Sequence, residues 1–117
     1  MEYIMEKCLR ASTHHIPENI IFSRSEPDGD GIYKVEIFDE CCISSFRILP
    51  YKKTPTAYFF DWQVFEPGKG TGTKLFPEIL SYLSKDYDNI KLQVSSKNTA
   101  AYKIYSRFGL EITESAD

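Results

Sequence analysis

The sequence has few cysteines, no long apolar run and no excess of basic residues. Its three cysteines, two of them the adjacent Cys41 and Cys42, form neither a C-x-x-C metal pair nor a disulfide framework. No apolar run approaches the ~20 residues that a membrane-spanning helix needs, and the charged first residues, 1–7, do not resemble a signal peptide. A net charge of −3 disfavours nucleic acid as a partner. These absences predict a protein of the reducing cytoplasm that binds neither membrane nor nucleic acid.

The two histidines do not predict a metal site. His14 and His15 are adjacent, so their side chains point in different directions, and no other ligand stands at metal-ligand spacing. The chain of 117 residues is 42% apolar and 15% aromatic, a composition typical of one folded core. We therefore expect a single domain, residues 1–117, without a metal cofactor.

Alternation of apolar and polar residues predicts a sheet-forming first half. From Ile32 to Phe38, apolar and charged side chains alternate as in a half-buried strand. Short connections favour antiparallel neighbours, and the segment 57–65, apolar on both faces, is expected at the centre of the sheet. The predicted strands cover residues 19–25, 32–38, 42–49, 57–65, 90–94 and 110–113.

Three segments are predicted to be helical. A weak pattern favours a short helix over residues 2–11. An apolar stripe predicts a helix over 71–85, in which Pro77 predicts a kink or a late start. A further helix over 99–108 is ended by Gly109. The order of strands and helices predicts an α+β fold with a βαβ-like second half.

Glycines at alternate positions join the long central strand to the helix that follows it. Gly68, Gly70 and Gly72 let the backbone approach a ligand closely, and the free N–H groups of the first helical turn suit phosphate. The order Lys69-Gly70 does not match the Walker motif, and the last glycine comes one residue early for the dinucleotide motif. A turn that merely packs the helix on the strand is the alternative. We call residues 68–72 the glycine loop.

Two motifs resemble those of the GNAT superfamily of N-acetyltransferases. Residues 67–72 resemble the acyl-CoA pyrophosphate loop, Gln/Arg-x-x-Gly-x-Gly/Ala, with Pro67 standing where Gln or Arg is usual. Residues 92–110 resemble a second signature of that family. The resemblance covers residues 33–113 but not the first thirty, where typical members have two helices for which this chain has no room. The positions that match the second signature are Asn98, Ala101, Ile104, Tyr105, Gly109 and Leu110.

The resemblance implies a mostly antiparallel sheet with splayed middle strands, two main helices and an abbreviated N-terminal helical part. It implies acetyl-CoA as co-substrate, with its pyrophosphate on the glycine loop and its pantetheine arm between the strands 59–65 and 90–94. A backbone N–H near Val64 or Phe65 would polarise the thioester carbonyl. By position, the cofactor-binding residues are Val64, Phe65, Gly68, Lys69, Gly70, Thr71, Gly72, Thr73, Asn98 and Tyr105.

The resemblance also implies roles for two residues of the second motif. Tyr105 matches the general acid, since a phenol of pKa about 10 stays protonated and can give its proton to a thiolate. Its alternative role is that of a buried aromatic. Asn98 matches a residue that contacts the cofactor, and its alternative role is a helix N-cap. Both roles are compatible for Asn98.

The sequence does not decide which residue is the general base or which amine is the acceptor. Asp61, expected on the same strand face as Phe59 and Gln63, and Glu66, at the end of that strand, are both candidates for the base. The acceptor is an amine that the sequence does not identify. The trimmed N-terminal part predicts an open acceptor side, which would admit a large substrate or be covered in a homodimer. A CoA-binding or protein-interaction module without catalysis is the alternative function, favoured by Pro67.

Overall fold

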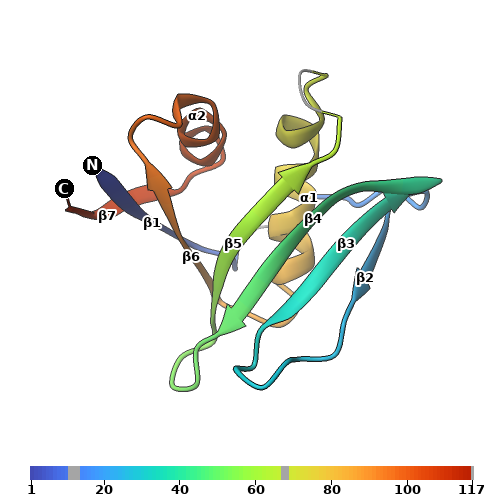
Figure 1. Ribbon diagram of the computed structural model, residues 1–117, viewed down its shortest axis with the longest axis horizontal. Coiled ribbons are helices and arrows are strands. Elements are labelled where there is room, and N and C mark those ends of the chain that lie inside the picture. The colour runs from blue at the N-terminus through green and yellow to red at the C-terminus, as the bar shows by residue number, and fades with distance from the viewer. Residues whose placement is uncertain (11–13, 67–68, 117) are drawn as a thin grey trace.

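The computed structural model describes residues 1–10, 14–66 and 69–116. Within these ranges, seven strands form one mixed sheet in the order β2-β3-β4-β5-β6-β1-β7 (Figure 1). Two helices complete the fold, which confirms the predicted α+β class. The elements are β1 (Glu2–Cys8), β2 (Ile21–Arg24), β3 (Tyr33–Asp39), β4 (Cys41–Pro50), β5 (Thr56–Val64), α1 (Thr71–Leu83), β6 (Asn89–Ser95), α2 (Thr99–Arg107) and β7 (Glu111–Ala116).

Strands β2 to β5 form the antiparallel meander that the short connections predict. Tyr33 of β3 pairs with Ile48 of β4, and Ile48 pairs in turn with Phe59 of β5. These three side chains are buried, because alternate residues of each strand point to the same face of the sheet. That face is the one on which the helix α1 packs.

The N-terminal segment is not the helix that we expected over residues 2–11. Glu2–Cys8 form β1, which lies between β6 and β7 and pairs antiparallel with both. Met5 stands opposite Leu92 on one side and Ile112 on the other, and only 1% of its surface is exposed. Two neighbouring strand edges satisfy the backbone N–H and C=O groups of β1, and this tertiary pairing outweighs a weak local helix preference.

The central strand β5 separates from its parallel neighbour β6. Their pairing covers only Thr56 to Tyr58, opposite Asn89 to Lys91. Beyond those residues β5 stays paired with β4 as far as Val64, while β6 stays paired with β1. The two strands therefore diverge toward their carboxyl ends, which confirms the predicted splay. We call the space between them the strand gap.

Helix α1 lies behind β5 and β4 in Figure 1, with its apolar stripe against the sheet. The ring of Phe76 packs 5.9 Å from the ring of Phe59, between centroids. The helix begins at Thr71 and continues through Pro77, so the predicted late start is wrong. Buried side chains lie on both sides of the proline, and each stabilises the helix by about 1.5–3 kcal/mol. Together they offset the ~3 kcal/mol that an internal proline costs.

The buried position of β1 generates a prediction about stability. Met5→Ala should lower the free energy of unfolding by about 2–5 kcal/mol, because it leaves a cavity in the core. Ile112→Ala, the matched change at the neighbouring position of β7, should cost less than about 1 kcal/mol, since 43% of Ile112 is exposed. Urea unfolding of the two variants measures both values. Equal losses would contradict the placement of β1 inside the sheet.

Candidate active site in the strand gap

A cavity of about 220 Å³ occupies the strand gap. One wall is the segment 59–62 of β5, and the other is the segment 92–95 of β6. The start and inner face of α2 close it, through Asn98, Ala101 and Tyr105. The cavity thus combines strand edges that are not paired with each other and side chains from a helix that follows directly after β6. Such an arrangement can hold an extended chain between the two strands through main-chain hydrogen bonds.

Tyr105 lies in this cavity and in the core at the same time. Its side chain is 7% exposed, and its ring centroid lies 5.2 Å from that of Phe76 and 6.1 Å from that of Trp62. Burial raises the pKa of Tyr105 to about 12. The phenol therefore keeps its proton at neutral pH, as a proton donor must. The sequence left two roles open for Tyr105, buried aromatic and general acid. Its ring is a buried aromatic and the residue lines the cavity, so its position is compatible with both.

Trp62, which the sequence analysis did not single out, anchors the wall opposite Tyr105. Its indole N–H donates to the Ser44 hydroxyl at 2.9 Å, and that hydroxyl donates to the carbonyl of Gln63 at 2.8 Å. The ring also packs against Phe76 of α1, with centroids 5.4 Å apart. Trp62 is the single tryptophan of the sequence and lies on the predicted central strand, and this feature could have identified it as important. Trp62 thereby fixes one side of the gap to both β4 and α1.

A β-bulge places Asp61 differently from our expectation. Ser45 pairs with Gln63 while Arg47 pairs with Phe60, so two residues of β5 stand opposite a single residue of β4. Asp61 adopts a positive φ of 53° at this point. The extra residue reverses the alternation of side chains along the strand.

As a result, Asp61 does not share a face with Phe59. Phe59 is 2% exposed and packs toward α1, whereas the Asp61 carboxylate lies 3.2 Å from the exposed Arg47 guanidinium on the opposite face. The amide of Gln63 also donates to Asp61, at 3.4 Å. Asp61 still lines the strand-gap cavity, which brings it into the same site as Tyr105 and Asn98.

The backbone near the end of β5 distinguishes the two candidate amides. The N–H of Phe65 donates to the carbonyl of Ile43 at 3.0 Å and is therefore occupied. Val64 stands opposite Ser44 in the antiparallel ladder. Since successive N–H groups of a strand point to opposite sides, the N–H of Val64 points away from β4, toward the gap. The candidate amide is thus the one on Val64.

The described part of the glycine loop presents the N-terminus of α1. Gly70 is its N-cap, with a positive φ of 74°, and no side chain in the described part of the chain caps the helix. The first helical hydrogen bond runs from Lys74 N–H to Gly70 C=O, so the N–H groups of Thr71, Gly72 and Thr73 have no acceptor within the helix. No acidic residue lies in the first turn. This helix end suits an anion. Pro67 and Gly68 lie outside the described residues.

The remaining predicted residues divide between the gap and its surroundings. Asn98 lines the gap and also caps α2, because its side-chain oxygen accepts the N–H of Ala101 at 3.2 Å. Lys69 and Glu66 form an exposed ion pair at 3.3 Å. Glu66 lines a different cavity, on the other side of α1. The structure therefore brings Asp61, Asn98 and Tyr105 together and leaves Glu66 apart.

Two further features of the chain concern metals and membranes. Across the described ranges, no three His, Cys, Asp or Glu side chains gather in an arrangement that could hold a metal ion. Over the same residues, no helix has the length and apolar character needed to cross a membrane.

Comparisons with known proteins support the fold. No family model matches the chain, and no curated protein does. Among solved structures, a conserved protein of unknown function from Staphylococcus epidermidis is similar with a TM-score of 0.66 at 16% identity, over 96% of this chain and 56% of that one. A GCN5-related N-acetyltransferase from Kribbella flavida is similar with a TM-score of 0.61 at 10% identity, over 94% of this chain and 53% of that one.

A Drosophila protein gives a TM-score of 0.61 at 10% identity, over 95% of this chain and 47% of that one. The chain therefore spans about half the length of these structures. At such low identities the likeness shows a GNAT-like fold and no more. It extends beyond residues 33–113, where the sequence motifs lie, because the aligned part covers nearly the whole chain.

The geometry of the glycine loop predicts opposite effects for two alanine substitutions. Gly70→Ala should lower the free energy of unfolding by about 1–2 kcal/mol, because a Cβ disfavours its positive φ. Gly72→Ala should be neutral or stabilising by up to about 1 kcal/mol, since a Cβ there would lie in ordinary contact, 3.5 Å from Ile104 and Trp62. Urea unfolding compares the two. A larger loss for Gly72→Ala would contradict the described backbone.

Proposed function

We propose that the protein transfers an acetyl group from acetyl-CoA to an amine. The observation that carries the proposal is the strand gap, whose cavity is lined by the buried Tyr105 and whose β5 strand leads toward the uncapped end of α1. The uncapped N-terminus of α1 suits the pyrophosphate of CoA, and the strand gap suits its pantetheine arm. The likeness to an acetyltransferase fold supports the proposal.

Backbone N–H groups at two places in this chain would bind CoA. The N–H groups of Thr71, Gly72 and Thr73 have no acceptor within the helix and are available to phosphate oxygens. Lys69 stands beside them, in its ion pair with Glu66. The N–H of Val64 points toward the gap, where it would donate to the thioester carbonyl. Donation to that oxygen stabilises the negative charge that develops on it when an amine attacks.

Tyr105 would act when the thioester breaks. The amine nitrogen forms a bond to the acetyl carbon, and the carbon–sulfur bond breaks to release a thiolate. Tyr105, protonated because burial raises its pKa to about 12, would donate its proton to that sulfur. The amine must also lose a proton. Asp61 is the candidate base, since it lines the same cavity, whereas Glu66 lies outside it.

A second candidate function is a CoA-binding module that does not catalyse. The observation that favours it is the packing of Tyr105, which is 7% exposed and surrounded by aromatic rings, so that its ring has a structural role whatever its hydroxyl does. Both candidates require CoA to bind, and only the first requires the phenolic proton. Two experiments separate them.

The first prediction concerns CoA binding. Acetyl-CoA should raise the melting temperature, and ATP at the same concentration should not. Gly70→Glu should weaken CoA binding by at least about tenfold, because it brings a negative charge to the phosphate site. Gly70→Ala is the matched control, since it carries the same backbone strain without the charge, and open space lies around the added Cβ. Equal affinities of the two variants, measured by calorimetry, would contradict the proposed phosphate site.

The second prediction concerns the proton donor. Tyr105→Phe keeps the ring and its packing but removes the acidic proton. It should lower kcat by about a hundredfold or more on the true acceptor, with little change in CoA affinity. Loss of the hydroxyl should change the free energy of unfolding by no more than about 1 kcal/mol. A folded variant that binds CoA and keeps near-normal kcat would exclude Tyr105 as the general acid.

A further inference from the structure

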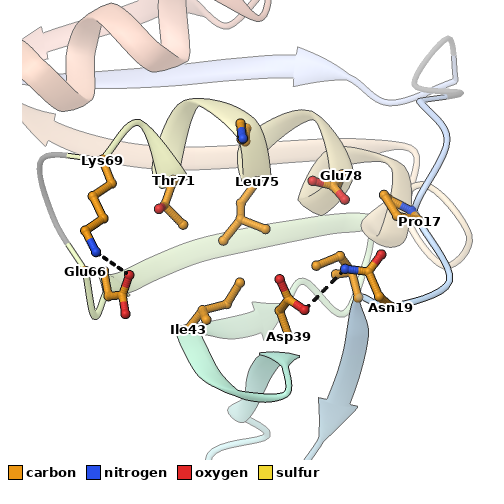
Figure 2. A pocket seen from close by; sticks show the side chains of 11 residues that line it. Pro17, Asn19, Asp39, Ile43, Glu66, Lys69, Thr71, Leu75 and Glu78 are labelled. Carbon is orange, nitrogen blue, oxygen red and sulfur yellow. Dashed lines mark hydrogen bonds and ion pairs between the residues drawn. The ribbon is translucent and has the colours of Figure 1, made fainter.

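A second cavity, of about 340 Å³, lies on the side of α1 away from the strand gap (Figure 2). It is bounded by α1, by the segment 17–20, by Asp39 of β3 and Ile43 of β4, and by Glu66 and Lys69 before α1. It shares no lining residue with the strand-gap cavity. Lys69 and Thr71, which stand at the proposed phosphate site, line one end of this cavity. The other end, which contains Glu78, has no role in the proposed acetyl transfer.

Glu78 of α1 is the unusual residue of this cavity. Its side chain is only 6% exposed, and its buried Oε1 atom has no hydrogen-bond partner among the residues that the structure describes. Lys74, one helical turn earlier, also lines the cavity, but among the described residues it forms no ion pair within 4.0 Å of Glu78. A buried carboxylate without a donor costs free energy, and proteins rarely leave one unpaired. The missing partner would be an N–H or O–H group that enters from outside.

The surroundings of Glu78 favour a role in binding a ligand over a structural role. Burial raises the pKa of its carboxyl, and the nearby charges of Lys74, His14 and His15 only partly oppose this effect. The pattern of the sequence gives a matching signal, since Glu78 interrupts the apolar stripe of α1 beside Ile79. A charged group kept at such a position without an internal partner points to a ligand.

The charges in the cavity are unevenly distributed. Figure 2 shows Glu78, Asp39 and Asn19 at one end, and the ion pair of Lys69 with Glu66 at the other. Asp39 accepts a hydrogen bond from the neutral amide of Asn19 at 3.2 Å, and it forms no ion pair within the described ranges. Lys69 and Glu66 neutralise each other. The Glu78 end therefore carries two carboxylates. The basic groups near Glu78 are Lys74, His14 and His15, and among the described residues none of them forms an ion pair with it within 4.0 Å.

We propose that this cavity binds a small organic ammonium ion, whose N–H group donates to the free Oε1 of Glu78. An ammonium group supplies the missing donor and places a positive charge in direct contact with the carboxylate, whereas a neutral donor supplies only the hydrogen bond. Asp39 stands at the same end and adds to the attraction. Glu78 and Asp39 do not line the strand gap, so the ion bound here is not the amine that accepts the acetyl group there. The ammonium ion would contact Glu78 and not the phosphate site at the other end of the cavity, so the proposal does not depend on CoA binding.

The test is an NMR titration of the ¹⁵N-labelled protein in the absence of any CoA compound. The probe is n-butylammonium, and n-butanol is the matched uncharged compound. Butylammonium should give saturable shifts of the amides in segments 74–79 and 39–43, and butanol should not. Shifts confined to segments 59–62 and 92–95 would mean that the amine enters the strand gap instead, and would overturn the proposal.

Variants complete the test. Glu78→Gln keeps the shape of the side chain and removes the charge, so the variant should fold and should bind butylammonium at least about tenfold more weakly. Glu114→Gln, the same change at an exposed position of β7, should leave binding unchanged. Equal affinity of the Glu78→Gln variant and the wild type, equal shifts with butanol, or no saturable shift in the wild type would each overturn the proposal. The last result would indicate that water alone satisfies Oε1.

Discussion

The interrupted pairing of β5 and β6 is the constraint on which the rest of the structure depends. Two parallel strands at the centre of the sheet pair for three residues and then diverge, although unpaired backbone groups inside a protein cost free energy. Each strand keeps a partner on its other side, β4 for β5 and β1 for β6. The unpaired edges therefore face each other across a cavity, where an extended ligand can satisfy them.

Aromatic packing fixes both sides of the gap to α1. Trp62 on β5 and Tyr105 on α2 both pack against Phe76 of α1, so one ring on the helix behind the sheet braces both walls. The hydrogen bond from Trp62 to Ser44 then ties the β5 wall to β4. Because its sides are fixed in this way, the gap exists before a ligand arrives. A preformed site loses less free energy to the ordering of its residues on binding. The residues that stabilise the core thus also shape the candidate site.

The strand β1 has a corresponding role on the other side of the gap. It pairs with the whole of β6, from Asn89 to Ser95, and so gives that strand a partner where β5 no longer pairs with it. The sheet without β1 would leave β6 with three residues of pairing to β5. The segment that we expected to be a short, weak helix is therefore one of the elements that position the candidate site.

Much of the fold could be predicted because its signals are local. Alternation identifies β3 and β4, the apolar stripe identifies α1, and the glycine loop and the Asn98–Tyr105 spacing identify the two ends of the site. The remaining features depend on partners distant in sequence. The residues around Met5 are compatible with a helix or a strand, and only the pairing of Met5 with Leu92, far away in the sequence, decides for a strand. The face of Asp61 depends on a bulge, and a bulge leaves little trace in the sequence.

Glu78 illustrates the same limit for function. A single carboxylate in an apolar stripe is visible in the sequence, but its lack of a partner is a property of the packed structure. The roles of Tyr105, Asn98 and Val64 rest on the resemblance between the sequence motifs and those of N-acetyltransferases, and the geometry is compatible with each. The similar solved structures share so little sequence identity with this chain that their likeness supports the fold and not these roles.

A crystal structure of the protein with acetyl-CoA tests the central claim most directly. The account predicts that the pyrophosphate contacts the N–H groups of Thr71, Gly72 and Thr73, that the pantetheine arm lies between β5 and β6, and that the sulfur stands within hydrogen-bond reach of the Tyr105 hydroxyl. Acetyl-CoA bound outside the strand gap, or a Tyr105 hydroxyl turned away from the sulfur in the complex, would contradict it.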